Sequence, residues 1–329
     1  MVSTVEVLGV PHAYELTSPA KTPPVLVFVH GWLLSRAYWQ PLIQQLSPYY
    51  QCLTYDLRGF GDSQTSRQVR VARLSPAAQV AASPSRPSSP ATLPLEQGVS
   101  TETLNTEISS GRYTPADYAH DLEILLEKLN LSNVWLVGHS LGGSISLWAA
   151  DQMGDRVKGV ICVNSGGGIY LKEEFERFRA AGEQLVRLRP RWLCYLPLLD
   201  RMMAWMNVAR PLPRSWGRRR LVDWTAADPE AALGALLDST TEEEVHRLPQ
   251  VVSRLKQPVY FLTGQQDTVM EPQYVQHLAS FHSLFHNNAN NVIEIPDCGH
   301  LAMLEQTDYV SQIILDILQK HSDSLPTSA

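Results

Sequence analysis

The sequence contains few cysteines, no long apolar run and no excess of positive charge. The four cysteines, Cys52, Cys162, Cys194 and Cys298, are scattered without a C-x-x-C pair, which is typical of free thiols and not of a zinc site or a disulfide framework. No run of about 18 or more apolar residues is present, and the N-terminus lacks the basic and apolar regions of a signal peptide. The formal net charge of −6 disfavours nucleic acid as a partner. We therefore expect a cytoplasmic protein that binds no nucleic acid.

What is present is an alternation of strand-like and helix-like segments along 329 residues, of which 44% are hydrophobic and 18% charged. Continuous apolar runs such as VLVFV are typical of strands that are buried on both faces of a parallel sheet. This alternation predicts an α/β fold, in which helices cover both faces of a mostly parallel sheet. The expected strands span 5–8, 12–16, 25–29, 51–56, 134–137, 157–164, 258–264 and 291–295, and the clearest helices span 37–47, 114–130, 141–153 and 301–319.

Two segments interrupt the alternation. Residues 64–112 contain five prolines and many Ser, Ala and Thr without clear periodicity, which is typical of a disordered insertion. Residues 167–250 have helix-like apolar content and lie between two expected strands. We expect them to form a helical cap over the carboxyl edge of the sheet, where open α/β sheets bind their ligands. The expected core then comprises 1–166 and 251–329.

The stretch Gly138-His139-Ser140-Leu141-Gly142 fits the pattern G-x-S-x-G and lies between an expected strand and an expected helix. A sharp turn in that position holds a serine in a strained conformation and requires small residues two positions away on each side. Ser140 is therefore the candidate nucleophile. A Gly-rich bend without catalytic function is the alternative interpretation.

A serine nucleophile also needs N–H donors where negative charge develops on the substrate oxygen. The sequence Val-His-Gly-Trp follows the buried strand 25–29, and a tight turn there would point the backbone N–H of Trp32 toward the pocket. The backbone N–H of Leu141 opens the helix after the candidate nucleophile. These two groups form the expected oxyanion hole. The Trp32 side chain either lines the acyl site or belongs to the core.

The serine needs a base, and the base needs an acid that orients it. His300 and Asp267 each follow an expected strand, so both should lie at the same sheet edge as Ser140. The other nine histidines lack this placement, and His139 should point away from the serine next to it. No acid follows the strand 157–164. The chain order Ser140, Asp267, His300 is that of α/β-hydrolases.

Five short blocks of the sequence resemble, in order, the signature blocks of the α/β-hydrolase superfamily, most closely its cofactor-independent esterase, lipase-like and haloperoxidase-like branch. They are HGW (30–32), DLRGFGDS (56–63), GHSLGG (138–143), GQQD (264–267) and DCGH (297–300). The resemblance implies an eight-stranded, mostly parallel sheet with a cap inserted after the sixth strand, and no metal or cofactor. It also implies a structural role for Asp56, Arg58 and Asp62. Epoxide hydrolases and haloalkane dehalogenases of this fold carry Asp in place of Ser140, which disfavours both chemistries.

Three functions stay open at this point. The first is a serine hydrolase that cleaves a carboxylic ester through an acyl-enzyme on Ser140. The second is a hydrolase that uses the same triad on a carbon–carbon bond, and the third is a ligand receptor or interaction module with little turnover. The sequence leaves the oligomeric state open.

The expected cap carries a local excess of positive charge, because residues 170–224 contain twelve Lys or Arg and six Asp or Glu. Its basic residues alternate with large apolar ones. One hypothesis is an amphipathic lid that contacts an anionic membrane. The other is a helical cap with an apolar underside and a solvated basic exterior. Both predict an apolar pocket roof, which suits a small lipophilic ester.

Overall fold

The protein is described by a computed structural model that covers residues 1–20, 22–64, 112–166, 172–286 and 291–322. The insertion expected at 64–112 therefore falls almost wholly outside the described residues, as do the first residues of the expected cap.

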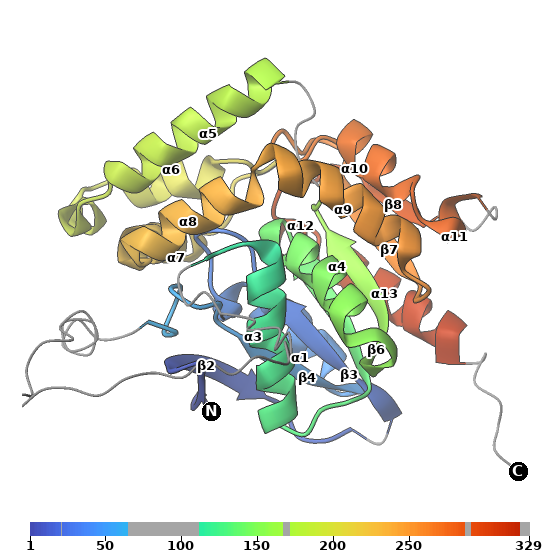
Figure 1. Cartoon of the computed structure of the whole chain (residues 1–329). Helices are drawn as coiled ribbons and strands as arrows, with labels where there is room; N and C mark the ends of the chain where they lie inside the picture. The colour runs from blue at the N-terminus through green and yellow to red at the C-terminus, as the bar shows by residue number, and fades with distance from the viewer. Residues whose placement is uncertain (21, 65–111, 167–171, 287–290, 323–329) are drawn as a thin grey trace, which may run out of the picture. The chain divides into compact units, whose positions relative to one another are not determined.

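An eight-stranded sheet forms the centre of the fold, with the strand order β1-β2-β4-β3-β5-β6-β7-β8 (Figure 1). Strand β2 runs antiparallel to both of its neighbours, and every pairing from β4 to β8 is parallel. The prediction of a mostly parallel eight-stranded α/β sheet is confirmed. The strands are β1 Ser3–Val7, β2 Val10–Leu16, β3 Thr22–Val29, β4 Tyr50–Tyr55, β5 Val134–His139, β6 Val157–Val163, β7 Val259–Gly264 and β8 Val292–Ile295.

Helices pack on both faces of this sheet. The helices that pack on the sheet are α1 Gln40–Leu46, α3 Pro115–Lys128, α4 Leu141–Met153, α9 Glu242–Arg254, α10 Pro272–Ala279, α12 Ala302–Glu305 and α13 Thr307–Ser322. Shorter elements are η1 Arg36–Trp39, η2 Gly154–Arg156 and α11 Ser283–His286. The helix expected over 301–319 is thus two helices, because the backbone leaves the helical region at Gln306 (φ −134°, ψ 46°).

A helical insert follows β6, as the resemblance implies, and lies beyond the sheet edge in Figure 1. It consists of α5 Lys172–Arg187, η3 Arg191–Tyr195, α6 Leu199–Trp205, α7 Arg214–Ala226 and α8 Pro229–Ser239. Helix α9 follows, and its Val251 and Val252 belong to the main hydrophobic core.

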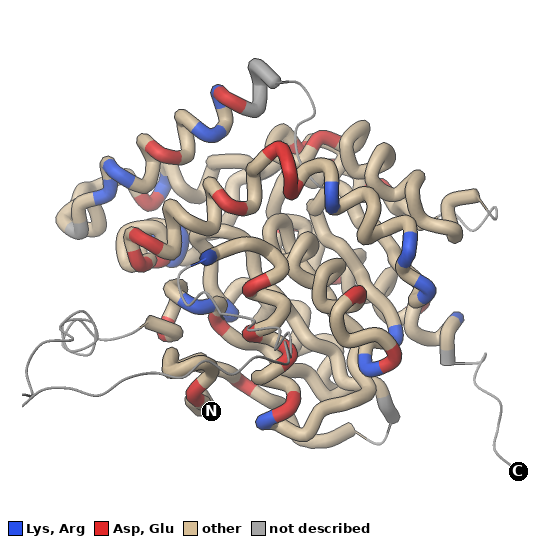
Figure 2. Tube along the Cα trace, in the orientation of Figure 1, with Lys and Arg blue, Asp and Glu red and all other residues tan. Residues whose placement is uncertain are grey.

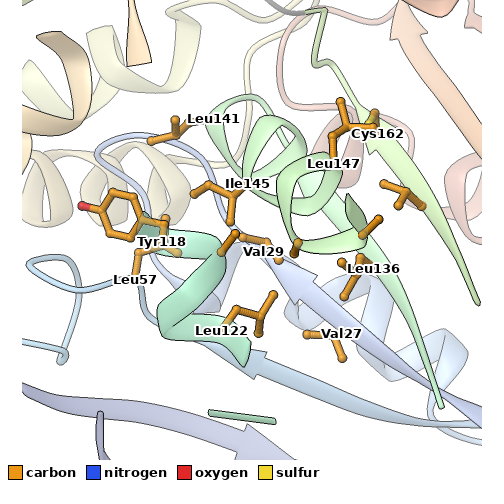
Figure 3. Packing of buried hydrophobic residues seen from close by; sticks show 14 of the residues in the cluster. Val27, Val29, Leu57, Tyr118, Leu122, Leu136, Leu141, Ile145, Leu147 and Cys162 are labelled. Carbon is orange, nitrogen blue, oxygen red and sulfur yellow. The ribbon is translucent and has the colours of Figure 1, made fainter. Parts of the chain in front are cut away.

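The core follows from the period of two residues along the central strands. In β3, Val27 and Val29 face one hydrophobic cluster, whereas Leu26 and Phe28 face the cluster on the other side. Strands β3, β5 and β7 contain no charged residue, and most charged residues lie in helices and loops (Figure 2). Figure 3 shows the first cluster, in which Val27 and Val29 of β3 lie among side chains of α3 and α4.

Helix α3 begins with a capping box at Thr114 and Asp117. The Thr114 hydroxyl accepts from the backbone N–H of Asp117 (3.1 Å), and the Asp117 carboxylate accepts from the backbone N–H of Thr114 (3.2 Å). This capping box satisfies two N–H groups that the helix itself cannot pair. It fixes the start of a helix whose Leu122, Leu125 and Leu126 are fully buried against the sheet.

Candidate active site

The three residues predicted to form a triad come together at the carboxyl edge of the sheet. Ser140 follows β5 directly, Asp267 lies in the turn after β7, and His300 lies in the turn after β8. Since these strands are parallel, their carboxyl ends meet at one edge. Ser140 and His300 both line a cavity of about 430 Å³ there.

Ser140 has backbone angles of φ 51° and ψ −121°, a conformation that a non-glycine residue rarely adopts. Its N–H donates to the Val163 carbonyl (3.1 Å), and its own carbonyl accepts from the N–H of Gly143 (2.9 Å). A Cβ atom at Gly138 would lie 2.2 Å from the Gly142 carbonyl oxygen. The strained turn therefore exists only because its flanking residues have no side chain.

Substitution of Gly142 by alanine should destabilise this turn strongly. The new Cβ would lie 2.2 Å from the Val29 carbonyl oxygen and 2.6 Å from that of His30, and both are backbone atoms at the end of β3. We expect a loss of about 3 kcal/mol or more in the free energy of unfolding, measured by urea denaturation.

Gly154→Ala is the matched control for Gly142→Ala. Gly154 has φ 52° and ψ −122°, but nothing lies within 4 Å of the position that its new methyl group would take, so its loss should come from backbone strain alone, about 1–3 kcal/mol. A smaller loss in Gly142→Ala than in Gly154→Ala would contradict the packing argument.

Asp267 and His300 form a buried pair. The His300 Nδ1 lies 2.8 Å from Asp267 Oδ2, and the backbone N–H groups of Val269 (2.8 Å) and Met270 (3.0 Å) donate to Oδ1. Burial opposes ionisation of Asp267, but the His300 imidazole and these N–H donors outweigh it, so the pKa of the carboxyl lies below its ordinary value. An ionised carboxylate can only accept, so Nδ1 of His300 carries the proton and Nε2 is left as an acceptor.

Three further residues hold this pair in place, and none of them is assigned such a role from the sequence. The Asn164 amide donates to Asp267 Oδ2 (2.9 Å) and to the Gly299 carbonyl (3.0 Å). His139, whose pKa burial lowers to about 3, is neutral and donates from Nε2 to the His300 carbonyl (2.7 Å). Glu305 accepts from the backbone N–H groups of Gly299 and Leu301 (3.0 Å each). In the sequence, the one feature that points to Asn164 and His139 is that each is a polar residue at or next to the end of a strand.

The two expected oxyanion donors lie at the same cavity. Trp32 and Leu141 both line it, and within the described residues neither backbone N–H donates to another protein group. Leu141 is the first residue of α4, where the N–H groups have no partner within the helix. The Trp32 side chain also borders the cavity, and its Nε1 donates to the Ala232 carbonyl of α8 (2.8 Å).

The block DLRGFGDS braces the loop beside these donors. The buried Asp56 carboxylate pairs with the Arg36 guanidinium and accepts from the backbone N–H groups of Arg36 (2.7 Å) and Asp62 (2.8 Å). Asp62 pairs with Arg36 (2.9 Å), and Arg58 pairs with Asp121 of α3 (2.8 Å). None of the three residues of the block borders the cavity, which fits a structural role.

The cavity roof comes from the helical insert and is mostly apolar. Two charged residues, Arg220 and Glu244, also border the cavity. Arg220 donates from Nη1 to the carbonyls of Met203 (2.8 Å) and Met206 (2.6 Å). Burial raises the pKa of Glu244. The apolar lining from the insert consists of Phe178, Ala181, Leu185, Met203, Met206, Trp224 and Leu236.

A buried polar contact joins the insert to the loop that carries Trp32. Asp223 of α7 accepts from the Ser35 hydroxyl (2.9 Å) and pairs with Arg219 (2.9 Å). Burial raises the pKa of Asp223 from 3.8 to about 6, although Arg219 acts in the opposite direction. A carboxyl with a raised pKa stabilises the fold at low pH, and this contribution is lost as the pH rises from about 4 through 6.

Comparison with Asp223→Asn should reveal this dependence. Between pH 4 and 7, the free energy of unfolding of the parent protein should fall by ~2 kcal/mol relative to that of the variant, measured by urea denaturation at each pH. Parallel pH profiles would show that Asp223 does not titrate in this range.

Within the described residues, no group of three or more His, Cys, Asp or Glu side chains is arranged to hold a metal ion. No helix among them is long and apolar enough to cross a membrane.

A serine on a strained strand–helix turn, beside a His–Asp pair at the carboxyl edge of a mostly parallel sheet, is the arrangement of an α/β-hydrolase. Residues 24–307 match the α/β-hydrolase fold family, and the chain belongs to this family.

Proteins similar in sequence to this chain include an esterase and a synthase. The chain is 27% identical over 309 residues to the pimeloyl-(acyl-carrier protein) methyl ester esterase of Xanthomonas axonopodis pv. citri, a match that covers 92% of this chain and 96% of that protein. It is 25% identical over 305 residues to the 2-succinyl-6-hydroxy-2,4-cyclohexadiene-1-carboxylate synthase of an Enterobacter species, covering 92% and 95%. A solved esterase from Thermogutta terrifontis shares the fold, with a TM-score of 0.66 and 22% identity over 97% of this chain and 98% of that one.

Proposed function

We propose that this protein is a serine hydrolase that cleaves a carboxylic ester with an apolar acyl or alcohol group through an acyl-enzyme on Ser140. The observation that carries the proposal is the His300 Nδ1–Asp267 Oδ2 contact of 2.8 Å beside the cavity that Ser140 and His300 share. The pair fixes the imidazole tautomer whose Nε2 accepts a proton.

In the proposed reaction, each of these groups has one role. Ser140 Oγ attacks the ester carbonyl carbon while His300 Nε2 takes its proton, and the carbonyl oxygen becomes an oxyanion that the N–H groups of Trp32 and Leu141 stabilise. The C–O bond to the alcohol breaks, and the alcohol leaves with the proton from His300. A water molecule, deprotonated by His300, then attacks the acyl-enzyme and releases the acid, which restores Ser140.

The cavity supports the choice of a small lipophilic ester. Its volume of about 430 Å³ lies in the ordinary range for small-molecule sites, and its roof is lined mainly by apolar side chains of the insert. The esterase among the relatives acts on a methyl ester by its name. A cytoplasmic location belongs to the proposal as well and rests on the sequence features alone.

A panel of p-nitrophenyl esters of increasing acyl length tests the proposal. We expect turnover of short and medium apolar acyl groups and a decline once the acyl chain exceeds the cavity. Turnover of a vinylogous diketone with no turnover of any ester would instead indicate the carbon–carbon hydrolase. Tight binding of the esters without turnover would indicate a receptor.

A further inference from the structure

One segment of the insert exposes an unusual number of large apolar side chains. Eight large apolar side chains in the described residues are more than half exposed, and six of them lie between residues 188 and 205. We call this segment the 188–205 face. These six are Leu188 (70%), Trp192 (58%), Tyr195 (83%), Leu198 (59%), Met202 (55%) and Trp205 (65%).

This exposure bears on the two hypotheses for the cap, which are an amphipathic lid that contacts an anionic membrane and a helical cap with a solvated basic exterior. An apolar underside is present, and in this stretch Met203 is buried, Met206 is half-buried, and both border the cavity. The aromatic residues of the same stretch, Trp192 and Trp205, are exposed to solvent. A solvated exterior that is simply basic does not account for them.

The charge around this face is strongly positive. Residues 187–220 contain nine arginines and a single acidic residue, Asp200, a local charge of +8 on a chain of −6. Figure 2 marks basic positions at the end of α5 and in α7. The exposed arginines of this stretch within the described residues are Arg187, Arg201, Arg210, Arg214 and Arg218.

Ion pairs neutralise these charges only in part. Arg214 pairs with Asp200, and Arg187 and Arg210 form exposed pairs with Glu183 (3.4 Å) and Asp297 (3.1 Å) that are worth little in water. The side chain of Arg201 has no ion-pair partner within the described residues. Positive charge therefore remains beside the exposed aromatic rings.

We propose that the 188–205 face docks on the surface of a membrane that contains anionic lipid. Tyr and Trp rings favour the headgroup region of a bilayer, and arginines beside them pair with lipid phosphates. A second copy of this chain fits poorly, because two such faces would bring like charges of +8 together.

Docking in this way would place the cavity roof at the lipid. Helix α6 exposes Met202 and Trp205 outward, while Met203 of the same helix borders the cavity that Ser140 lines. For the proposed function, the membrane would be the source of the lipophilic substrate. Membrane binding itself does not depend on catalysis.

Vesicle co-sedimentation of the full chain tests the proposal, with phosphatidylcholine vesicles compared with vesicles that also contain phosphatidylserine. We expect binding to the anionic vesicles that weakens as salt is raised, and little binding to phosphatidylcholine alone. The triple variant Arg187→Gln, Arg201→Gln, Arg210→Gln should bind about 100-fold more weakly, at about fivefold per arginine. Tyr195→Ser, at the most exposed apolar position of the face, should also weaken binding.

Matched controls come from exposed residues elsewhere. Tyr49→Ser (58% exposed) and Arg247→Gln of α9 should leave vesicle binding unchanged. Ser140→Ala should bind vesicles as the parent does, so loss of the proposed esterase function and loss of docking are separately visible. Binding that ignores lipid charge, equal binding by all variants, or dimerisation through this face in light scattering would overturn the proposal.

Discussion

Ser140→Ala should lower kcat for activated carboxylic esters by a factor of about 10⁴ or more while the fold stays intact. The hydroxyl is the protein group that forms the acyl-enzyme in the proposed reaction, and alanine has no nucleophilic atom to take its place. Residual hydrolysis should come only from the oxyanion donors and the cavity. The measurement is steady-state hydrolysis of p-nitrophenyl butyrate, with circular dichroism as the check on folding.

Ser144→Ala is the matched control for this loss. Ser144 lies one helical turn further along α4 and borders the same cavity, but it does not occupy the strained turn. Its removal should change kcat by less than about threefold. A large loss in the Ser144 variant, or near-parental activity in the Ser140 variant, would contradict the assignment of the nucleophile.

Asp267→Asn should lower kcat by a factor of about 10³ to 10⁴ with little change in KM. The substitution removes the charge that fixes the His300 tautomer, and it places an amide where a carboxylate now accepts four N–H donors, from His300, Asn164, Val269 and Met270. Substrate binding should be spared because Asp267 does not border the cavity.

Asp297→Asn provides the control for Asp267→Asn. Asp297 lies three residues before His300, is well exposed and pairs with Arg210 at the surface. The same chemical change there should leave kcat within about twofold. If Asp297→Asn were the more damaging of the two, the acid of the triad would have been misassigned.

The sheet and the position of Ser140 follow from local sequence. Buried parallel strands such as 25–29 have continuous apolar runs, and the turn at 138–142 has glycines where an added Cβ would lie 2.2 Å from a backbone oxygen. Such features depend on neighbours in the chain, and for this reason all eight strands were expected close to their observed bounds. The strand-end positions of Asp267 and His300 follow from the same alternation.

The residues that position the His–Asp pair could not be found in this way. Asn164 contacts Asp267 across 103 residues of sequence, and His139 contacts the His300 carbonyl across 161. Neither contact leaves a local pattern, because each depends on how β5, β6 and the turns after β7 and β8 are placed in space. The expectation that His139 points away from the serine missed its contact with the His300 turn.

The orientation of the insert could not be predicted from the sequence for a related reason. Its apolar residues do not follow one helical period, since η3 ends at Tyr195 and α6 begins only after Leu198, which has a positive φ of 70°. A pattern of Trp, Leu and Met can therefore place Met203 at the cavity and Trp205 in solvent. Composition alone could not distinguish the inner from the outer side.

Labelling with a fluorophosphonate, followed by intact-mass measurement and peptide mapping, identifies the nucleophilic residue directly. We expect one phosphonyl group per chain, attached to Ser140, because this serine occupies the strained turn at the cavity that His300 also borders. The rate of labelling should fall steeply in Asp267→Asn and remain parental in Ser144→Ala. No adduct, or an adduct at another serine, would show that Ser140 is not the activated nucleophile.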